Sequence, residues 1–134
     1  MMRRDNQSHR NAVVIGVNVA VAVMHLFTGP DYRGPLRLFV TGYLIDLLLP
    51  FSAYFLLVAA EHTAPWLKSG WTKVAIVVGV MSTAEFAQYL GAPIFGRTFD
   101  PLDLVAYAGG ALAAAAADRW LIWRVPPAPD CNTL

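Results

Sequence analysis

The feature that most constrains this chain is the recurrence of apolar runs about as long as a bilayer is thick. Four such runs cover residues 12–28, 36–60, 74–92 and 102–117. They lack the broad, periodic polar face of a helix on the surface of a soluble domain. Since a helix needs about 20 apolar residues to cross the hydrocarbon, the pattern predicts an all-α integral membrane four-helix bundle. The composition agrees, because 57% of the residues are hydrophobic and the mean hydropathy is +0.49.

The segments around these runs are polar. Residues 1–11 form a basic N-terminal segment, and the proline-rich residues 124–134 are expected to be a disordered tail. Between them, 12–123 is the predicted transmembrane domain. A charged start before an apolar run is also typical of a secretory signal, but the sequence GPDYRGP after the first run lacks a small-x-small cleavage pattern. Pro50 is expected to kink the second span.

The distribution of basic residues predicts the orientation of the bundle. With four spans, both termini and the polar loop 61–73 share one side, which holds seven of the ten Lys and Arg residues, and the other side holds three. Both termini are therefore expected in the cytoplasm. Asp118 and Arg119, with their tryptophan neighbours, are interpreted as an interfacial anchor on that side.

Charge and cysteine content exclude several classes of protein. A formal net charge of +1 leaves no basic surface for nucleic acid. The single cysteine, Cys131, excludes an internal disulfide and a cysteine-based metal cluster. The sequence contains no G-x-S-x-G, H-E-x-x-H or glycine-rich phosphate loop. No cofactor and no metal site are therefore predicted.

Polar residues inside the spans gather at one depth, in the outer half of the predicted bundle. Asp46 lies roughly 12 Å from the outer end of its span, and Glu85 roughly 8–14 Å from the outer end of its own. His25 and Asp103 lie near the outer ends of the first and last spans. Because an ionised side chain in the bilayer core is costly, such groups normally face a protein interior or water. All four spans thus contribute to one candidate site.

Helical spacing and the outer loop extend this candidate site. Gln88 follows Glu85 by three residues and Tyr107 follows Asp103 by four, so each pair shares a helix face. Arg97, in the loop before the last span, is expected to reach Glu85 and bind its carboxylate bidentately. The loop also ends in an ordinary helix start.

That helix start is Asp100 followed by Pro101. Aspartate is a preferred N-cap residue, and proline is well suited to the first helical position. Asp103 then falls in the first turn, where a negative charge favours the helix dipole. Two of the three charges in the loop therefore have a local explanation, whereas Glu85 does not.

Three consecutive motifs carry a family resemblance: STAEFAQ (82–88), GRTFDPLD (96–103) and YAGG (107–110). Together they resemble the VanZ-like membrane proteins. The family's motif residues correspond here to Glu85, Gln88, Arg97, Asp100, Asp103 and Gly110. Tyr107 stands where the family has asparagine, and Ala114 replaces a glycine, so the similarity is that of a distant relative. The resemblance implies a multi-pass protein of the bacterial cytoplasmic membrane, and no particular reaction.

The leading hypothesis is a site that binds or acts on a lipid-linked or amphiphilic cell-envelope component. The hypothesis assigns catalytic roles to Glu85, Arg97 and Asp103, and ligand-binding roles to Gln88, Asp100, Asp46, His25 and Tyr107. A small proton- or ion-coupled transporter is one alternative. A structural or assembly subunit, including a homo-oligomer, is another, as are polar groups that only join the helices. A divalent-cation site and an intramembrane serine hydrolase have weaker support, and whether the protein is an enzyme stays open.

Overall fold

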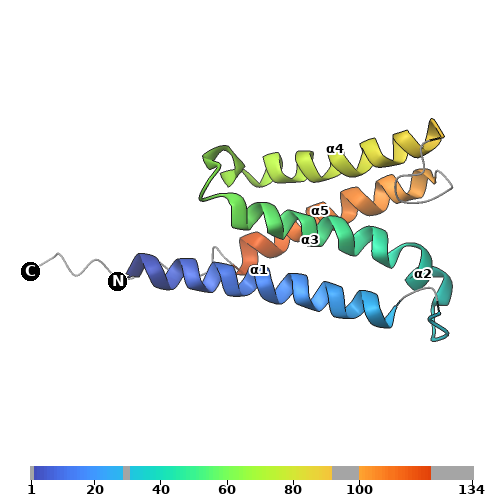
Figure 1. The fold of residues 1–134 in the computed structure, drawn as a ribbon, viewed down its shortest axis with the longest axis horizontal. Helices are drawn as coiled ribbons and strands as arrows, with labels where there is room; N and C mark the ends of the chain where they lie inside the picture. The colour runs from blue at the N-terminus through green and yellow to red at the C-terminus, as the bar shows by residue number, and fades with distance from the viewer. Residues whose placement is uncertain (1, 29–30, 92–99, 122–134) are drawn as a thin grey trace, which may run out of the picture.

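The computed structural model describes residues 2–28, 31–91 and 100–121, and these residues are helical with no strand (Figure 1). The predicted all-α class is therefore confirmed. The elements are α1 (Met2–Phe27), α2 (Arg37–Gly42), α3 (Leu44–Ala60), a 3₁₀ helix η1 (Pro65–Lys68), α4 (Gly70–Tyr89) and α5 (Pro101–Leu121).

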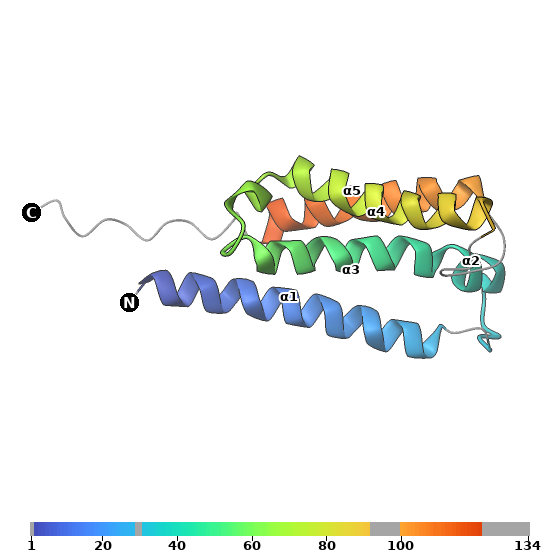
Figure 2. The same ribbon diagram turned by 45° about the horizontal axis from the view of Figure 1, so that its top comes forward.

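The four long helices lie side by side with α3 at the centre (Figures 1 and 2). α3 packs against α5, α4 and α1, and α4 also packs against α5. α1 packs mainly against α3, and Figure 2 shows its C-terminal half sloping away from the other helices. We name each end of the bundle after one residue that lies there, and call the two ends the Lys73 end and the Glu85 end.

Local sequence explains where α4 and α5 begin. Ser69 precedes α4, and its Oγ accepts the Thr72 backbone N–H at 3.4 Å, so the helix starts four residues before the predicted 74. At α5, Asp100 Oδ1 accepts the Leu102 backbone N–H at 2.9 Å and Pro101 is the first helical residue. The predicted N-cap at Asp100 is confirmed.

The second apolar run breaks at Tyr43, whereas the sequence analysis expected its disturbance at Pro50. α3 continues through Pro50, and Tyr43 separates it from the short α2. Two neighbours explain the break, since glycine at 42 is a poor helix former and the Thr41 hydroxyl donates to the Arg37 carbonyl at 2.8 Å. The apolar run is therefore two helices.

By length and composition, one helix of the described residues, Gln7–Phe27, is long and apolar enough to cross a membrane. The apolar Leu44–Ala60, with 17 residues, is shorter. The break at Tyr43 is the reason for that shorter length. Length and composition thus support one membrane span among the described residues, and four spans stay a prediction.

The bundle is apolar on its outside and carries buried charge on its inside. Large apolar side chains are exposed on every long helix, for example Ile15 (63% exposed), Leu56 (56%), Val80 (61%) and Val105 (68%). In contrast, three charged residues in the described part of the chain are buried, and they are Lys73 (1% exposed), Glu85 (4%) and Asp118 (6%). Charged residues are almost never fully buried in soluble domains unless they are paired. Both ends of this bundle therefore need a specific explanation.

Gly110 sets the distance between α5 and α3. A Cβ atom added at Gly110 would collide with the Leu47 carbonyl oxygen and lie 2.8 Å from the Pro50 ring. The adjacent Gly109 has no atom within 4 Å of the same position. The two neighbouring glycines thus form a natural matched pair.

We expect Gly110→Ala to lower the free energy of unfolding by about 1–3 kcal/mol, because the new methyl group must push the α3 backbone away. Gly109→Ala should stay within about 0.5 kcal/mol of the parent protein. Denaturant titration in detergent, followed by circular dichroism, measures both. Equal stability of the two variants would contradict the close contact of α3 and α5.

Candidate functional site

Glu85 is the central residue of the candidate site. It lies in α4 with 4% of its surface exposed, and its Oε1 accepts a hydrogen bond from the Tyr107 hydroxyl of α5 at 2.8 Å. Its second oxygen, Oε2, is buried and has no hydrogen-bond partner among the described residues. A buried acceptor without a donor costs about 1–3 kcal/mol, and more when it is charged. Oε2 is therefore an acceptor that a ligand could satisfy.

Two further carboxyl groups lie beside Glu85. Asp46 of α3 and Asp103 of α5 lie close enough to interact with each other and with Glu85. Asp100 adds a further negative charge that acts on both. We call Asp46, Glu85, Asp100 and Asp103 the carboxyl cluster, to which α3, α4 and the start of α5 contribute.

Pro50 leaves a backbone acceptor at the same place. In an α-helix the carbonyl of residue 46 accepts from the N–H of residue 50, but proline has no N–H. The main-chain carbonyl of Asp46, a member of the carboxyl cluster, thus lacks its usual helical donor. A polar residue and a proline four positions later therefore supply both a side-chain and a main-chain acceptor.

The other predicted site residues have different positions. Gln88 is half-buried one turn beyond Glu85 on α4. His25 is exposed near the end of α1, and the described contacts include no bond between it and the carboxyl cluster. Arg97 lies outside the described residues, so its pairing with Glu85 stays a prediction. The structure thus brings together Asp46, Glu85, Asp100, Asp103 and Tyr107.

The chemistry of the carboxyl cluster is that of hydrogen-bond acceptors. In the part of the chain that the structure describes, no three His, Cys, Asp or Glu side chains are arranged to hold a metal ion. The ion pairs found there all lie at the Lys73 end. The cluster is therefore acidic and suited to a ligand that donates hydrogen bonds or carries positive charge.

A second group of buried polar residues surrounds Lys73. The Lys73 ammonium group forms ion pairs with Glu61 and, at 3.3 Å, with Asp118, and it lies 5.0 Å from the centre of the Tyr54 ring. The Tyr54 hydroxyl donates to Asp118 at 2.9 Å. Arg10 of α1 donates to Glu61 at 2.7 Å and to the Val58 carbonyl at 3.0 Å. We call Arg10, Tyr54, Glu61, Lys73 and Asp118 the Lys73 network.

The sequence analysis missed this network. It assigned Glu61 and Lys73 to a polar loop and Asp118 to an interfacial anchor, whereas Lys73 and Asp118 are buried. The sequence did contain a signal. Along the chain, Arg10, Glu61, Lys73 and Asp118 alternate in sign, and in an up-and-down bundle all four lie toward the same end of the bundle. The depths of the charged residues at the inner ends of the predicted spans would have grouped these four residues, as depth grouped Asp46 and Glu85 at the outer ends.

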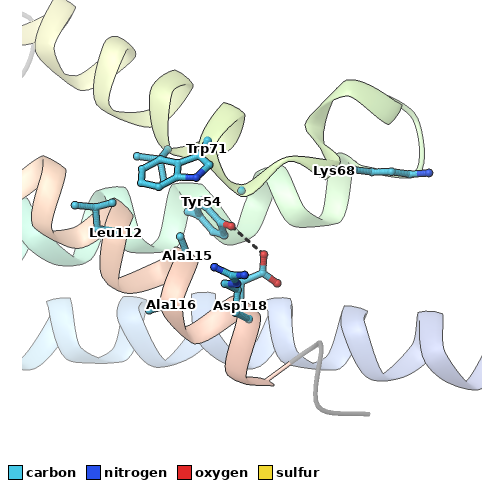
Figure 3. A pocket seen from close by; sticks show the side chains of 10 residues that line it. Tyr54, Lys68, Trp71, Leu112, Ala115, Ala116 and Asp118 are labelled. Atoms are coloured by element: carbon cyan, nitrogen blue, oxygen red, sulfur yellow. Dashed lines mark hydrogen bonds between the residues drawn. The ribbon is translucent and has the colours of Figure 1, made fainter. Parts of the chain in front are cut away.

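A pocket of about 430 Å³ lies next to the Lys73 network, between α4 and α5 (Figure 3). Its walls are mainly apolar, and charged side chains line one part of it. The lining residues are Tyr54, Lys68, Gly70, Trp71, Val74, Leu112, Ala115, Ala116, Asp118 and Arg119.

The fold and the two polar groups define an all-α bundle with buried charge at both ends. Comparisons with known proteins gave no matching family model, no matching curated protein and no matching solved structure. The VanZ-like resemblance therefore depends on the motif residues alone and stays a prediction.

Lys73→Met should lower the free energy of unfolding by about 3–5 kcal/mol, because buried Asp118 would lose its cation and half-buried Glu61 would keep only Arg10. Lys68→Met is the matched control, since Lys68 is exposed and the described residues offer it no ion pair. Thermal unfolding in detergent compares the two. A Lys73→Met variant as stable as the control would show that the network contributes no stability.

Proposed function

We propose that this chain is a VanZ-like protein of the bacterial cytoplasmic membrane that spans the bilayer four times. In this proposal both termini are cytoplasmic, and the carboxyl cluster binds a lipid-linked or amphiphilic cell-envelope component. The exposed apolar side chains of α1, α3, α4 and α5 support the membrane placement, since they would otherwise contact water. The charged side chains of Lys73, Glu85 and Asp118 are buried inside the bundle, where they would be kept away from lipid, and this also supports the membrane placement.

Helix lengths are compatible with four spans. α4 has 20 residues and α5 has 21, which at 1.5 Å per residue gives about 30 Å, the thickness of the hydrocarbon. α3 alone is shorter, and α2 precedes it after a break of one residue. Together α2 and α3 have the length that one span requires.

Three tryptophans mark the level of one membrane surface. Trp66 (64% exposed), Trp71 (76%) and Trp120 (61%) come from η1, α4 and α5 at the Lys73 end. Tryptophan is enriched at membrane–water interfaces, where its ring meets the headgroups. Exposed Lys68 and Arg119 accompany these rings, which fits the cytoplasmic side by the positive-inside rule.

The observation that carries the proposed function is that Oε2 of buried Glu85 has no hydrogen-bond partner among the described residues. A carboxylate at this depth is costly unless a donor compensates it, and Tyr107 satisfies only the other oxygen. A hydroxyl, amide or amine of a bound ligand would supply the missing donor. Arg97 is proposed to hold an anionic group of the same ligand, as the VanZ-like motif suggests.

The described residues then have distinct roles. Tyr107 holds Oε1 of Glu85 through its hydrogen bond, and in this proposal Oε2 is left for the ligand. Glu85 accepts a hydrogen bond, or a proton, from the ligand. In this proposal Asp46 and Asp103 add carboxyl oxygens that accept further hydrogen bonds from the ligand. The Asp46 carbonyl, freed by Pro50, is an additional acceptor.

We expect Glu85→Gln to reduce the amount of co-purifying amphiphile about tenfold, because the hydrogen bond to a charged acceptor is lost. Native mass spectrometry of the full-length protein in mild detergent measures this amount. Thr83→Ala is the matched control on α4, since Thr83 is exposed and its hydroxyl bonds only the Gly79 carbonyl at 2.7 Å. Equal retention by Glu85→Gln and the parent protein would refute the binding site.

The single native cysteine tests the proposed orientation. Cys131 should resist a membrane-impermeant maleimide in intact cells and react after the membrane is permeabilised. Arg33→Cys in a Cys131→Ser background should react in intact cells, because 33 lies on the proposed outer side. Gel-shift detection of the labelled protein distinguishes the two patterns. The reverse pattern would place the termini outside and would invert both ends of the bundle.

A second candidate function is proton-coupled transport. The specific observation in its favour is that the carboxyl groups of Asp46, Glu85 and Asp103 lie close enough to influence one another's charge. Four short helices enclose little volume, so transport would require an oligomer. Proton flux into proteoliposomes separates the two functions, because a carrier moves protons and a binding site alone does not.

A further inference from the structure

We infer that the pocket between α4 and α5 at the Lys73 end binds an anionic phospholipid of the adjacent leaflet. This inference rests on the membrane placement proposed above, and it concerns a different end of the bundle from the carboxyl cluster. The pocket has the two parts that such a lipid requires, which are a charged region for the phosphate and an apolar region for the chains.

The apolar and charged parts are separated in space. Figure 3 shows Leu112 and Trp71 toward one side of the pocket, and Asp118 and Lys68 toward the other. Leu112 lies six positions before Asp118 along α5, closer to the middle of the bundle. Trp71 and Leu112 are also exposed to the outside of the bundle, at 76% and 46%. A lipid chain can therefore leave the pocket along an apolar surface.

The charged part carries uncompensated positive charge. Lys68 and Arg119 line the pocket, and neither forms an ion pair with a described residue. The nearest carboxylates are already neutralised, because Asp118 pairs with Lys73 and Glu61 pairs with Lys73 and Arg10. Lys68 and Arg119 can therefore bind an anion from outside the protein. At the surface of a phospholipid bilayer, that anion is the phosphodiester of a headgroup.

The first turn of α4 adds to this preference. Gly70 and Trp71 line the pocket, and they are the first two residues of the helix. The backbone N–H groups of a first helical turn have no intrahelical acceptor, and the helix dipole is positive there. Helix N-termini bind phosphate for this reason. The helix end and the two cations therefore act on the same group.

The size of the pocket agrees with one headgroup. Its volume of about 430 Å³ lies within the range of roughly 300–1,000 Å³ that small-molecule sites occupy. The Tyr54 hydroxyl lines the pocket, but it already donates its hydrogen bond to Asp118, so it is not available to bind the phosphate. Selectivity is thus expected from charge, with phosphatidylglycerol preferred over phosphatidylcholine.

The test uses the full-length protein in phosphatidylcholine vesicles with a small fraction of brominated phosphatidylglycerol or, in parallel, brominated phosphatidylcholine. Bromine quenches tryptophan fluorescence on contact, and Trp71 lies in the pocket wall. We expect phosphatidylglycerol to quench more strongly at equal mole fraction. Trp71→Phe should remove this excess, which assigns it to the pocket.

Lys68→Gln combined with Arg119→Gln should reduce the preference for phosphatidylglycerol roughly 25-fold, at about fivefold for each cation. Arg33→Gln combined with Arg37→Gln removes the same charge at the other end of the bundle and should keep the preference. Ala116→Phe narrows the pocket while both cations stay, and it should also remove the preference. This variant separates a pocket from a merely basic surface.

Equal quenching by the two lipids, or a preference that survives loss of Lys68 and Arg119, would overturn the inference. Loss of the excess quenching on addition of soluble glycerol phosphate would make a free phosphate the ligand and would also overturn it. Absence of quenching by either lipid would instead refute the membrane placement. Amphiphile retention at Glu85 should be unchanged in all pocket variants, so failure of this site and failure of the proposed function are distinguishable.

Discussion

The ammonium group of Lys73 is buried away from water. The helices of the bundle are positioned so that carboxylates balance its charge. A buried cation is tolerated only when carboxylates and hydrogen-bond acceptors surround it. Glu61 arrives from the end of α3 and Asp118 from the end of α5, while Lys73 itself belongs to α4. Arg10 then joins α1 to the same group through Glu61. One requirement for charge balance therefore fixes four helices at one end, which non-directional apolar packing alone would not do.

The two ends of the bundle solve the problem of buried charge differently. The Lys73 network contains two cations and two carboxylates, and its buried polar atoms have partners. At the Glu85 end the described side chains supply carboxyl groups without a matching cation, and Glu85 Oε2 has no donor. A neutral, satisfied network is suited to holding helices together. An acidic cluster with an unsatisfied acceptor can bind a ligand directly, which is why the envelope ligand is assigned to that end, whereas the phospholipid is inferred to bind in the pocket beside the Lys73 network.

The sequence predicted what depends on residues close in the chain. Apolar runs identified the long helices, and the Asp100–Pro101 pair identified the start of α5. The inward position of Glu85 also followed, because a carboxylate in the middle of an apolar run has few alternatives. Contacts over long separations did not follow, such as Arg10 with Glu61 across 51 residues or Tyr54 with Asp118 across 64. Thr41 and Gly42 interrupt the helix next to Tyr43, although the surrounding run is apolar. The average composition of a long window does not detect such local effects.

The weak attachment of α1 has a consequence for biosynthesis. α1 packs mainly against α3, and its Arg10 needs Glu61 and the Val58 carbonyl, both of which leave the ribosome about 50 residues later. In the proposed membrane placement, α1 stays in the bilayer without a partner during that interval. It is also the helix of the described residues that is long and apolar enough to do so by itself. The less apolar α4 and α5 can instead enter as a pair that covers its own polar groups, so the order of the helices along the chain matches the order in which the membrane can accept them.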